Sequence, residues 1–270
     1  MNSRKILFIV GVFVSTFSSA SMFAGGIITI EENRRNKTVI NKTFIEKHLM
    51  RMESKIDDEM YIAIFNAEKE ILYNLDIQNK TYVQITKTDL EKVGSKMNNV
   101  NSMLEEKLKD LPEEQKEMMR KMLQQKMPGQ AEQKKDKTYS LISENEKVMN
   151  WKCDKYRVKE GDDLLKDVWV TDWKNSGLKV EYKNVLKSME KFFNFFTSQL
   201  GNQVKSQSLN LDFSLADKGI PVKTIYYANG EENGSSIVKE IKEEELPITL
   251  FIVPTDFKRS NPFEQFQITD

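Results

Sequence analysis

The feature that most restricts the fold of this chain is a series of short β-strand patterns, which begins near Gly25 and continues to Thr86. β-Branched and aromatic residues form clusters in this region, and short polar stretches separate one cluster from the next. The polar stretches at residues 66–69 and 76–80 indicate hairpin turns, because Asn and Asp side chains hydrogen-bond to the backbone of a turn. The region therefore predicts an antiparallel meander.

Two other segments carry a helical period. From residue 89 to 130, apolar residues recur three or four positions apart, and Pro112 divides the segment into two predicted helices because proline suits a first helical turn. From residue 180 to 200 the apolar stripe is wider, and Phe195 lies outside it. Apolar groups on more than one side are typical of a buried helix.

Strand patterns return after residue 138. In the last third of the chain we predict strands at residues 209–215, 221–227, 236–241 and 248–253. The dipeptide Asn229–Gly230 predicts a hairpin, since both residue types tolerate positive φ. About ten strands and two helical segments together predict a single α+β domain.

The first residues have the pattern of an export signal. Arg4 and Lys5 precede an apolar run from residue 6 to 14, and small residues lead to Ala20. We expect a signal peptide over residues 1–20, with cleavage after Ala24 as the alternative. The apolar run is shorter than the roughly 20 residues that span a membrane. We therefore expect a periplasmic or secreted protein with no transmembrane anchor after signal removal.

The charge balance and the single cysteine narrow the expected partners. Lys+Arg and Asp+Glu each number 41, so the formal net charge is zero, and no basic excess predicts a nucleic-acid partner. Cys153 is the only cysteine, which excludes an intrachain disulfide. It lies far from the signal, so it is not the acylated cysteine of a bacterial lipoprotein. Because free cysteine is among the most buried residue types, we expect Cys153 in the core.

Several short phrases occur in an order that resembles a known family. They span residues 44–47, 50–53, 76–82, 153–156, 168–171, 219–222 and 250–254, followed by Phe257 and Lys258. In this order they resemble the exported bacterial domains of domain-of-unknown-function family 4412. The resemblance implies the LolA-like lipoprotein-carrier fold, which is a strongly curved antiparallel sheet, or half-barrel, with helices over its concave face. It implies one domain over residues 25–258, a helical elaboration at 89–130 and a tail at 259–270.

The sequence carries no recognisable catalytic motif, and the family resemblance brings no catalytic residues. His48 is the only histidine, and no serine lies in a nucleophile-elbow motif. Two Ser-x-x-Lys matches, at residues 188–191 and 236–239, lack the other motifs of penicillin-recognising enzymes. A glycine-rich phosphate loop and a paired-histidine zinc motif are also missing from the sequence. We predict a protein that is not an enzyme and that needs no cofactor.

The methionines raise a metal-binding alternative. His48, Met50 and Met52 alternate along a predicted strand and would project from one face, and thioether and imidazole ligands suit Cu(I). A second group lies on a predicted helix: Met118, Met119, Met122 and Met127. The competing interpretation is packing, because methionine is a common gap filler in irregular cores.

A curved sheet beneath helices encloses a space, and we predict that the protein carries an apolar small molecule, a lipid or an acylated protein there. The candidate cavity-lining residues are Met50, Met52, Met118, Met122, Met189, Phe192, Phe193 and Phe196. The alternative function is that of an envelope structural or interaction protein whose interior these side chains fill. A periplasmic copper-binding protein is the third candidate.

Overall fold

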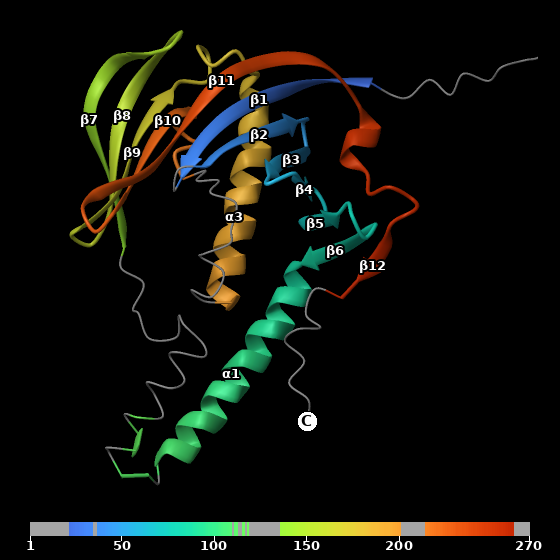
Figure 1. The fold of residues 1–270 in the computed structure, drawn as a ribbon, viewed down its shortest axis with the longest axis vertical. Helices are drawn as coiled ribbons and strands as arrows, with labels where there is room; N and C mark the ends of the chain where they lie inside the picture. Colours follow the sequence, from blue (N-terminus) through green and yellow to red (C-terminus); the bar gives the residue numbers. More distant parts are fainter. Residues whose placement is uncertain are drawn as a thin grey trace, which may run out of the picture.

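One twelve-stranded sheet dominates the computed structural model of this protein (Figure 1). The structure describes residues 22–34, 37–109, 111–112, 115–116, 118, 136–200 and 214–261. The strand order is β12-β6-β5-β4-β3-β2-β1-β11-β10-β9-β8-β7. All neighbouring strands are antiparallel except β12 and β6, which are parallel. The predicted signal peptide, residues 1–20, lies outside the described residues.

The first half of the sheet is the predicted meander. Its strands are β1 (Met22–Arg34), β2 (Lys37–Ile45), β3 (Leu49–Ile56), β4 (Glu59–Asn66), β5 (Ile71–Asp76) and β6 (Thr81–Thr86). Both predicted hairpin turns are present. The Asn66 side-chain oxygen accepts a hydrogen bond from the Lys69 backbone N–H at 2.9 Å, and the Asp76 carboxylate accepts one from the Asn79 N–H at 2.9 Å. These bonds satisfy the turn backbone locally, which is the reason for the prediction.

The second half of the sheet joins the first through the pairing of β11 with β1. Its strands are β7 (Lys137–Val148), β8 (Trp151–Glu160), β9 (Asp163–Thr171), β10 (Ile220–Ala228) and β11 (Glu231–Pro247). Asn229 and Gly230 form the predicted turn between β10 and β11, with φ angles of 54° and 82°. Of the strand predicted at 209–215, residues 209–213 lie outside the described residues, and Ser214 and Leu215 belong to a turn.

The helix α3 (Lys183–Leu200), preceded by the 3₁₀ turn η1 (Val180–Tyr182), confirms the predicted second helical segment. Its apolar stripe packs against one face of the sheet, which we call the helix face; Ile28, Met50 and Phe65 belong to that face. The helix α1 (Lys87–Lys109) contacts α3 but extends away from the sheet (Figure 1). The first turns of α1 pack in the main core through Leu90 and Val93, so the expectation that both helical segments cover the sheet holds only for the start of α1.

The opposite, or outer, face of the first half is covered by the end of β11 and the chain that follows it. Leu246 and Phe251 pack there against Ile27, Ile64 and Leu75. Residues Ile248–Phe251 form the 3₁₀ helix η3, so the strand predicted at 248–253 is wrong. Proline at the end of β11 lacks the N–H that would continue the ladder, and this ends the strand. The segment then forms β12 (Lys258–Ser260) beside β6, so residues 259–260 of the predicted tail belong to the sheet.

The predicted half-barrel is wrong in its curvature and in its strand number. The sheet has twelve strands rather than about ten, and it stays open between its edge strands β12 and β7. Both faces of its first half carry apolar side chains, and different segments cover the two faces. Among the described residues, no helix is long and apolar enough to cross a membrane.

Candidate functional site: a pocket between α3 and the sheet

A cavity of about 90 Å³ lies between α3, the turn after it and the helix face of the sheet; we call it the α3 pocket. Its walls come from β1, β2, β9, β10 and β11, and most of the lining side chains are apolar. The lining residues are Ile28, Ile30, Thr43, Lys166, Val168, Leu186, Leu215, Ile220, Pro221, Val222, Thr224, Tyr226, Ser236 and Val238. The volume is enough for several water-sized groups but is below the roughly 300 Å³ of a small drug-sized site.

Lys166 is the unexpected member of this lining. It lies on β9 in register with Tyr226 of β10, and Val168 follows it on the same side of the strand. Only 9% of Lys166 is exposed, whereas lysine ammonium groups normally reach water. Burial lowers the pKa of Lys166 from its ordinary value near 10.5 to about 7, and the positive charges of Lys137 and Arg34 act in the same direction. At neutral pH the amine is therefore poised between its charged and neutral forms.

Tyr226 belongs to the pocket lining, and the charged side chains of Arg34 and Glu32 lie beside it. The Arg34 guanidinium carbon lies 4.4 Å from the centre of the Tyr226 ring, and Arg34 pairs with Glu32. The Asn41 side-chain amide donates to the Glu32 carboxylate at 3.2 Å. Burial raises the pKa of the Tyr226 phenol, and its hydrogen bonds with Ser236 and Arg34 act in the opposite direction. The pocket thus has an apolar wall and an end that carries hydrogen-bond donors.

Among the described residues that were predicted to line a cavity, none belongs to the lining of the α3 pocket. Met50, Met52, Met189 and Phe192 are buried in the main core, and Phe193 and Phe196 are half-buried against it. Met118 is 61% exposed, and Met122 lies outside the described residues. In this region the core is filled by methionine and aromatic side chains, as the packing interpretation expects.

The structure separates the three residues of the proposed copper site. His48 precedes β3 rather than belonging to it, so the alternation argument does not apply to its side chain. The imidazole Nε2 of His48 lies 3.3 Å from a Glu68 carboxylate oxygen, and the side chain is 42% exposed. Met50 and Met52 are instead buried in the core. Met119, Met122 and Met127 of the second methionine group lie outside the described residues.

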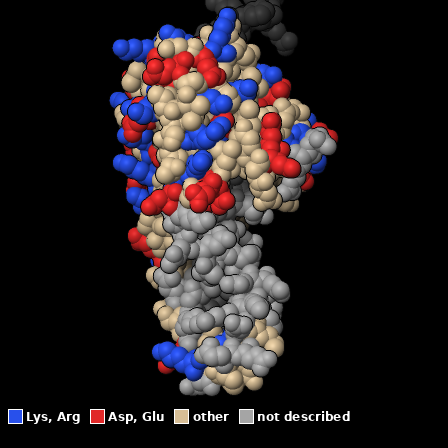
Figure 2. Space-filling view, turned by 90° about the vertical axis from the view of Figure 1, so that its left-hand side faces the viewer, with Lys and Arg blue, Asp and Glu red and all other residues tan. Residues whose placement is uncertain are grey.

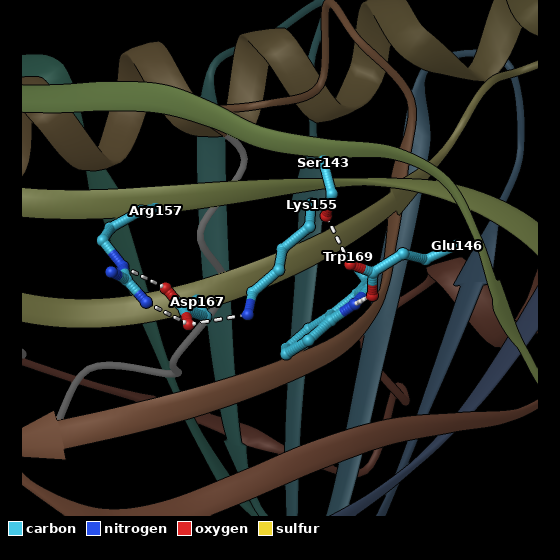
Figure 3. Close-up of polar contacts among 6 residues, drawn as sticks. All are labelled: Ser143, Glu146, Lys155, Arg157, Asp167 and Trp169. Atoms are coloured by element: carbon cyan, nitrogen blue, oxygen red, sulfur yellow. Dashed lines mark hydrogen bonds and ion pairs between the residues drawn. The ribbon is translucent and has the colours of Figure 1, made fainter.

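A second polar cluster lies on the opposite face of β8 and β9 (Figure 3). The buried Asp167 carboxylate accepts two hydrogen bonds from Arg157, at 2.8 and 3.0 Å. It also forms an ion pair with Lys155 at 3.1 Å. Burial alone would raise the pKa of Asp167, but the two cations outweigh it and lower that pKa. Trp169 donates to Glu146 at 2.5 Å, and Lys155 lies over its ring. The polar and charged groups of this cluster therefore pair with one another, which is typical of a structural network.

Cys153 lies in the core, as predicted, with 1% of its surface exposed. Burial raises the pKa of its thiol to about 11. The reactive species of cysteine is the thiolate, so this residue is a poor nucleophile in the folded protein. On the face of the molecule that Figure 2 shows, positive and negative side chains are interspersed.

The sequence pattern of β9 contains a feature that indicates the buried lysine of the α3 pocket. In β9, Leu164, Lys166, Val168 and Val170 occupy alternate positions and therefore one face. Lys166 is the one charged residue on this otherwise apolar strand face, and this feature would have predicted its burial. Its neighbours Arg34 and Tyr226 come from β1 and β10, and only the register of the sheet brings them near it.

Comparison with known proteins supplies no family for the chain. No protein-family model and no curated protein matches it. The chain is structurally similar to an uncharacterised conserved protein from Thermus thermophilus, at 9% identity and a TM-score of 0.45, with 88% of this chain and 90% of that chain covered. It is also similar to PNGF-II, at 10% identity and a TM-score of 0.40, over 89% of this chain and 32% of that one.

A further similar structure is that of the MucA/MucB complex from Pseudomonas aeruginosa, at 8% identity and a TM-score of 0.39. The match covers 87% of this chain and 57% of that one. Similarities at this level assign no ligand or activity. Membership of family 4412 stays a prediction.

Proposed function

We propose that this protein is a non-catalytic binding or carrier protein that holds an apolar group in the α3 pocket. The observation that carries the proposal is the composition of the pocket wall, where Ile28, Val222 and Val238 of the sheet lie opposite Leu186 of α3. Transfer of an alkyl group from water to such a wall is favourable by about 0.8 kcal/mol per methylene. The export pattern at the N-terminus supports a role in the periplasm or outside the cell.

The pocket volume restricts the size of the ligand. A cavity of about 90 Å³ holds a short alkyl segment, and it does not hold a complete lipid. We infer that the ligand is a small apolar molecule or one end of an acyl chain. Entry of a longer chain requires α3 and the turn at Leu215 to separate from the sheet, because Leu186 and Leu215 form the wall opposite the strands.

A homologous series of straight-chain alcohols, from propanol to octanol, tests the proposal. Each added methylene should tighten binding about fourfold, which is the ratio that corresponds to 0.8 kcal/mol, until the cavity is full. Beyond that length the affinity should level off. Chemical-shift titration of isotope-labelled protein would measure the dissociation constants and would show whether the shifts gather around Val222 and Val238.

The variant Ile30→Phe is the matched test of location, because Ile30 lines the pocket and a larger ring there would occupy it. We expect this variant to weaken binding at least tenfold. The control is Ile40→Phe, since Ile40 lies on β2 and is 43% exposed. Affinity that rises with chain length without a plateau, and that neither variant changes, would show adsorption to the surface and would exclude the proposal.

One observation favours the alternative of an interaction protein. The edge strand β7 exposes Tyr139, Leu141 and Ile142, and its outer hydrogen-bonding side faces no strand of the described sheet. Such an edge can accept a strand from a partner. Replacement of Leu141 by Lys should abolish binding to an envelope partner if this alternative is correct, and it should leave alcohol binding unchanged. The two proposals therefore give separate readouts.

A further inference from the structure

The pattern at the N-terminus leaves two cleavage points for the predicted signal peptide, and the start of β1 distinguishes them. We propose that a signal peptidase cleaves the bond between Ala20 and Ser21, and that the residues from Met22 onward belong to the sheet of the mature protein. Cleavage after Ala24 would instead remove the first three residues of β1. Processing at either bond is independent of the α3 pocket.

The backbone of the first three residues of β1 is paired in the sheet. Residues 22–24 lie in antiparallel register with residues 245–247 of β11, and the two strands run side by side (Figure 1). The ladder with β2 begins only at Gly26, so β11 is the one strand partner of residues 22–24 in the described sheet. A chain terminus is poorly ordered unless such pairing holds it. These residues therefore belong to the fold rather than to a removable leader.

The end of β11 in turn depends on residues 22–24. The ladder between β10 and β11 reaches only to Ile237, so in the described sheet residues 245–247 pair with β1 alone. Leu246 lies in this stretch, is 2% exposed and packs on the outer face of the first half. The 3₁₀ helix η3 follows directly and continues the same cover. A chain that began at Gly25 would leave the backbone N–H and C=O groups of this stretch without a partner strand.

A buried tyrosine also uses a backbone group of this segment. The hydroxyl of Tyr182, a residue that is 1% exposed, donates a hydrogen bond to the Ala24 carbonyl oxygen at 3.2 Å. Burial raises the pKa of Tyr182 to about 12, so the phenol keeps its proton and acts as the donor. Removal of Ala24 would take away this acceptor, and a buried polar group that loses its partner destabilises the fold.

The residue types around the two bonds agree with cleavage after Ala20. A signal peptide ends in small residues at the last position and two positions before it. Ala20 and Ser18 satisfy this pattern, whereas Met22 stands two positions before Ala24. Hydrolysis adds one water molecule across the Ala20–Ser21 peptide bond. The released leader then ends in the Ala20 carboxylate, and the mature chain begins with the Ser21 amine.

N-terminal sequencing and intact mass of the protein that a bacterial host exports from the full-length precursor would test the proposal. We expect an N-terminus at Ser21. Any other N-terminus, including Gly25 or an uncut Met1, would overturn the proposal. In the same host, Ala20→Leu should block cleavage, and the matched change Ala24→Leu should leave cleavage unchanged. Loss of processing in Ala24→Leu alone would also overturn it.

Two purified chains, one beginning at Ser21 and one at Gly25, would test the role of the first residues in the sheet. In urea unfolding the shorter chain should have the lower midpoint, because it lacks the start of β1. Tyr182→Phe should lower the midpoint of the longer chain more than that of the shorter chain, in which the Ala24 acceptor is already lost. The control Tyr139→Phe, at an exposed tyrosine of β7, should leave both midpoints unchanged. Equal midpoints for the two chains, or an equal effect of Tyr182→Phe in both, would overturn the assignment of residues 22–24 to the mature sheet.

Discussion

Replacement of the buried lysine Lys166 by methionine should stabilise the protein by an amount that depends on pH. The folded protein lowers the pKa of Lys166 from near 10.5 to about 7. Each pH unit between these values corresponds to about 1.4 kcal/mol, so the full cost of burying the charge is about 5 kcal/mol as an upper bound. The folded-state pKa is depressed, so the cost is absent above pH 10.5, grows as pH falls, and is complete below pH 7.

Urea unfolding of the wild-type protein and of Lys166→Met, at one-unit steps from pH 6 to pH 10, would measure this cost. The variant should be more stable by several kcal/mol at pH 7, and its advantage should shrink by about 1.4 kcal/mol per pH unit between pH 7.5 and 10. Other titrating groups are common to both proteins, so they cancel in the difference. The control Lys159→Met should give a small difference that does not vary with pH. A constant difference for Lys166→Met across the range would refute the reasoning.

Three further outcomes follow from the same structure. Arg157→Met should lower the unfolding free energy by about 2 kcal/mol in urea titration, because it removes two hydrogen bonds from a buried carboxylate; a change below 0.5 kcal/mol would contradict this role. Gly219→Ala should cost about 3 kcal/mol, since a Cβ there would lie 1.8 Å from the Thr171 carbonyl oxygen. Gly230→Ala, which meets open space at φ +82°, should cost less, and equal losses would exclude the steric explanation. Cys153 should resist a thiol-specific disulfide reagent at pH 8 until the protein is unfolded, because burial raises its pKa to about 11; rapid labelling of native protein would show an open core.

The turns, the helix and the buried cysteine whose structure depends on residues nearby in the sequence were predictable. The turns at residues 66–69 and 76–80 depend on Asn and Asp side chains that bond to their own backbone, and the 229–230 turn depends on residues that tolerate positive φ. The helix α3 follows from its own apolar stripe. The burial of Cys153 follows from the general preference of free cysteine for the core.

Segments whose structure depends on contacts with residues distant in the sequence were not predictable in this way. An apolar run such as 248–253 is compatible with a strand or with a 3₁₀ turn, and its contact with the outer face of the sheet decides between them.

The sequence by itself determined that this chain forms hairpin-connected strands and an amphipathic helix that buries methionine and phenylalanine, because those features depend on neighbours a few residues apart. Only the tertiary structure decided where the empty space lies. The predicted side chains Met50, Met189 and Phe192 fill the core, while the cavity is bounded by strands from both halves of the sheet. Lys166 and Tyr226 are distant in sequence, and the pairing of β10 with β9 brings both to the cavity lining. The pairing of β1 with β11 and of β11 with β10 brings Arg34 over the Tyr226 ring.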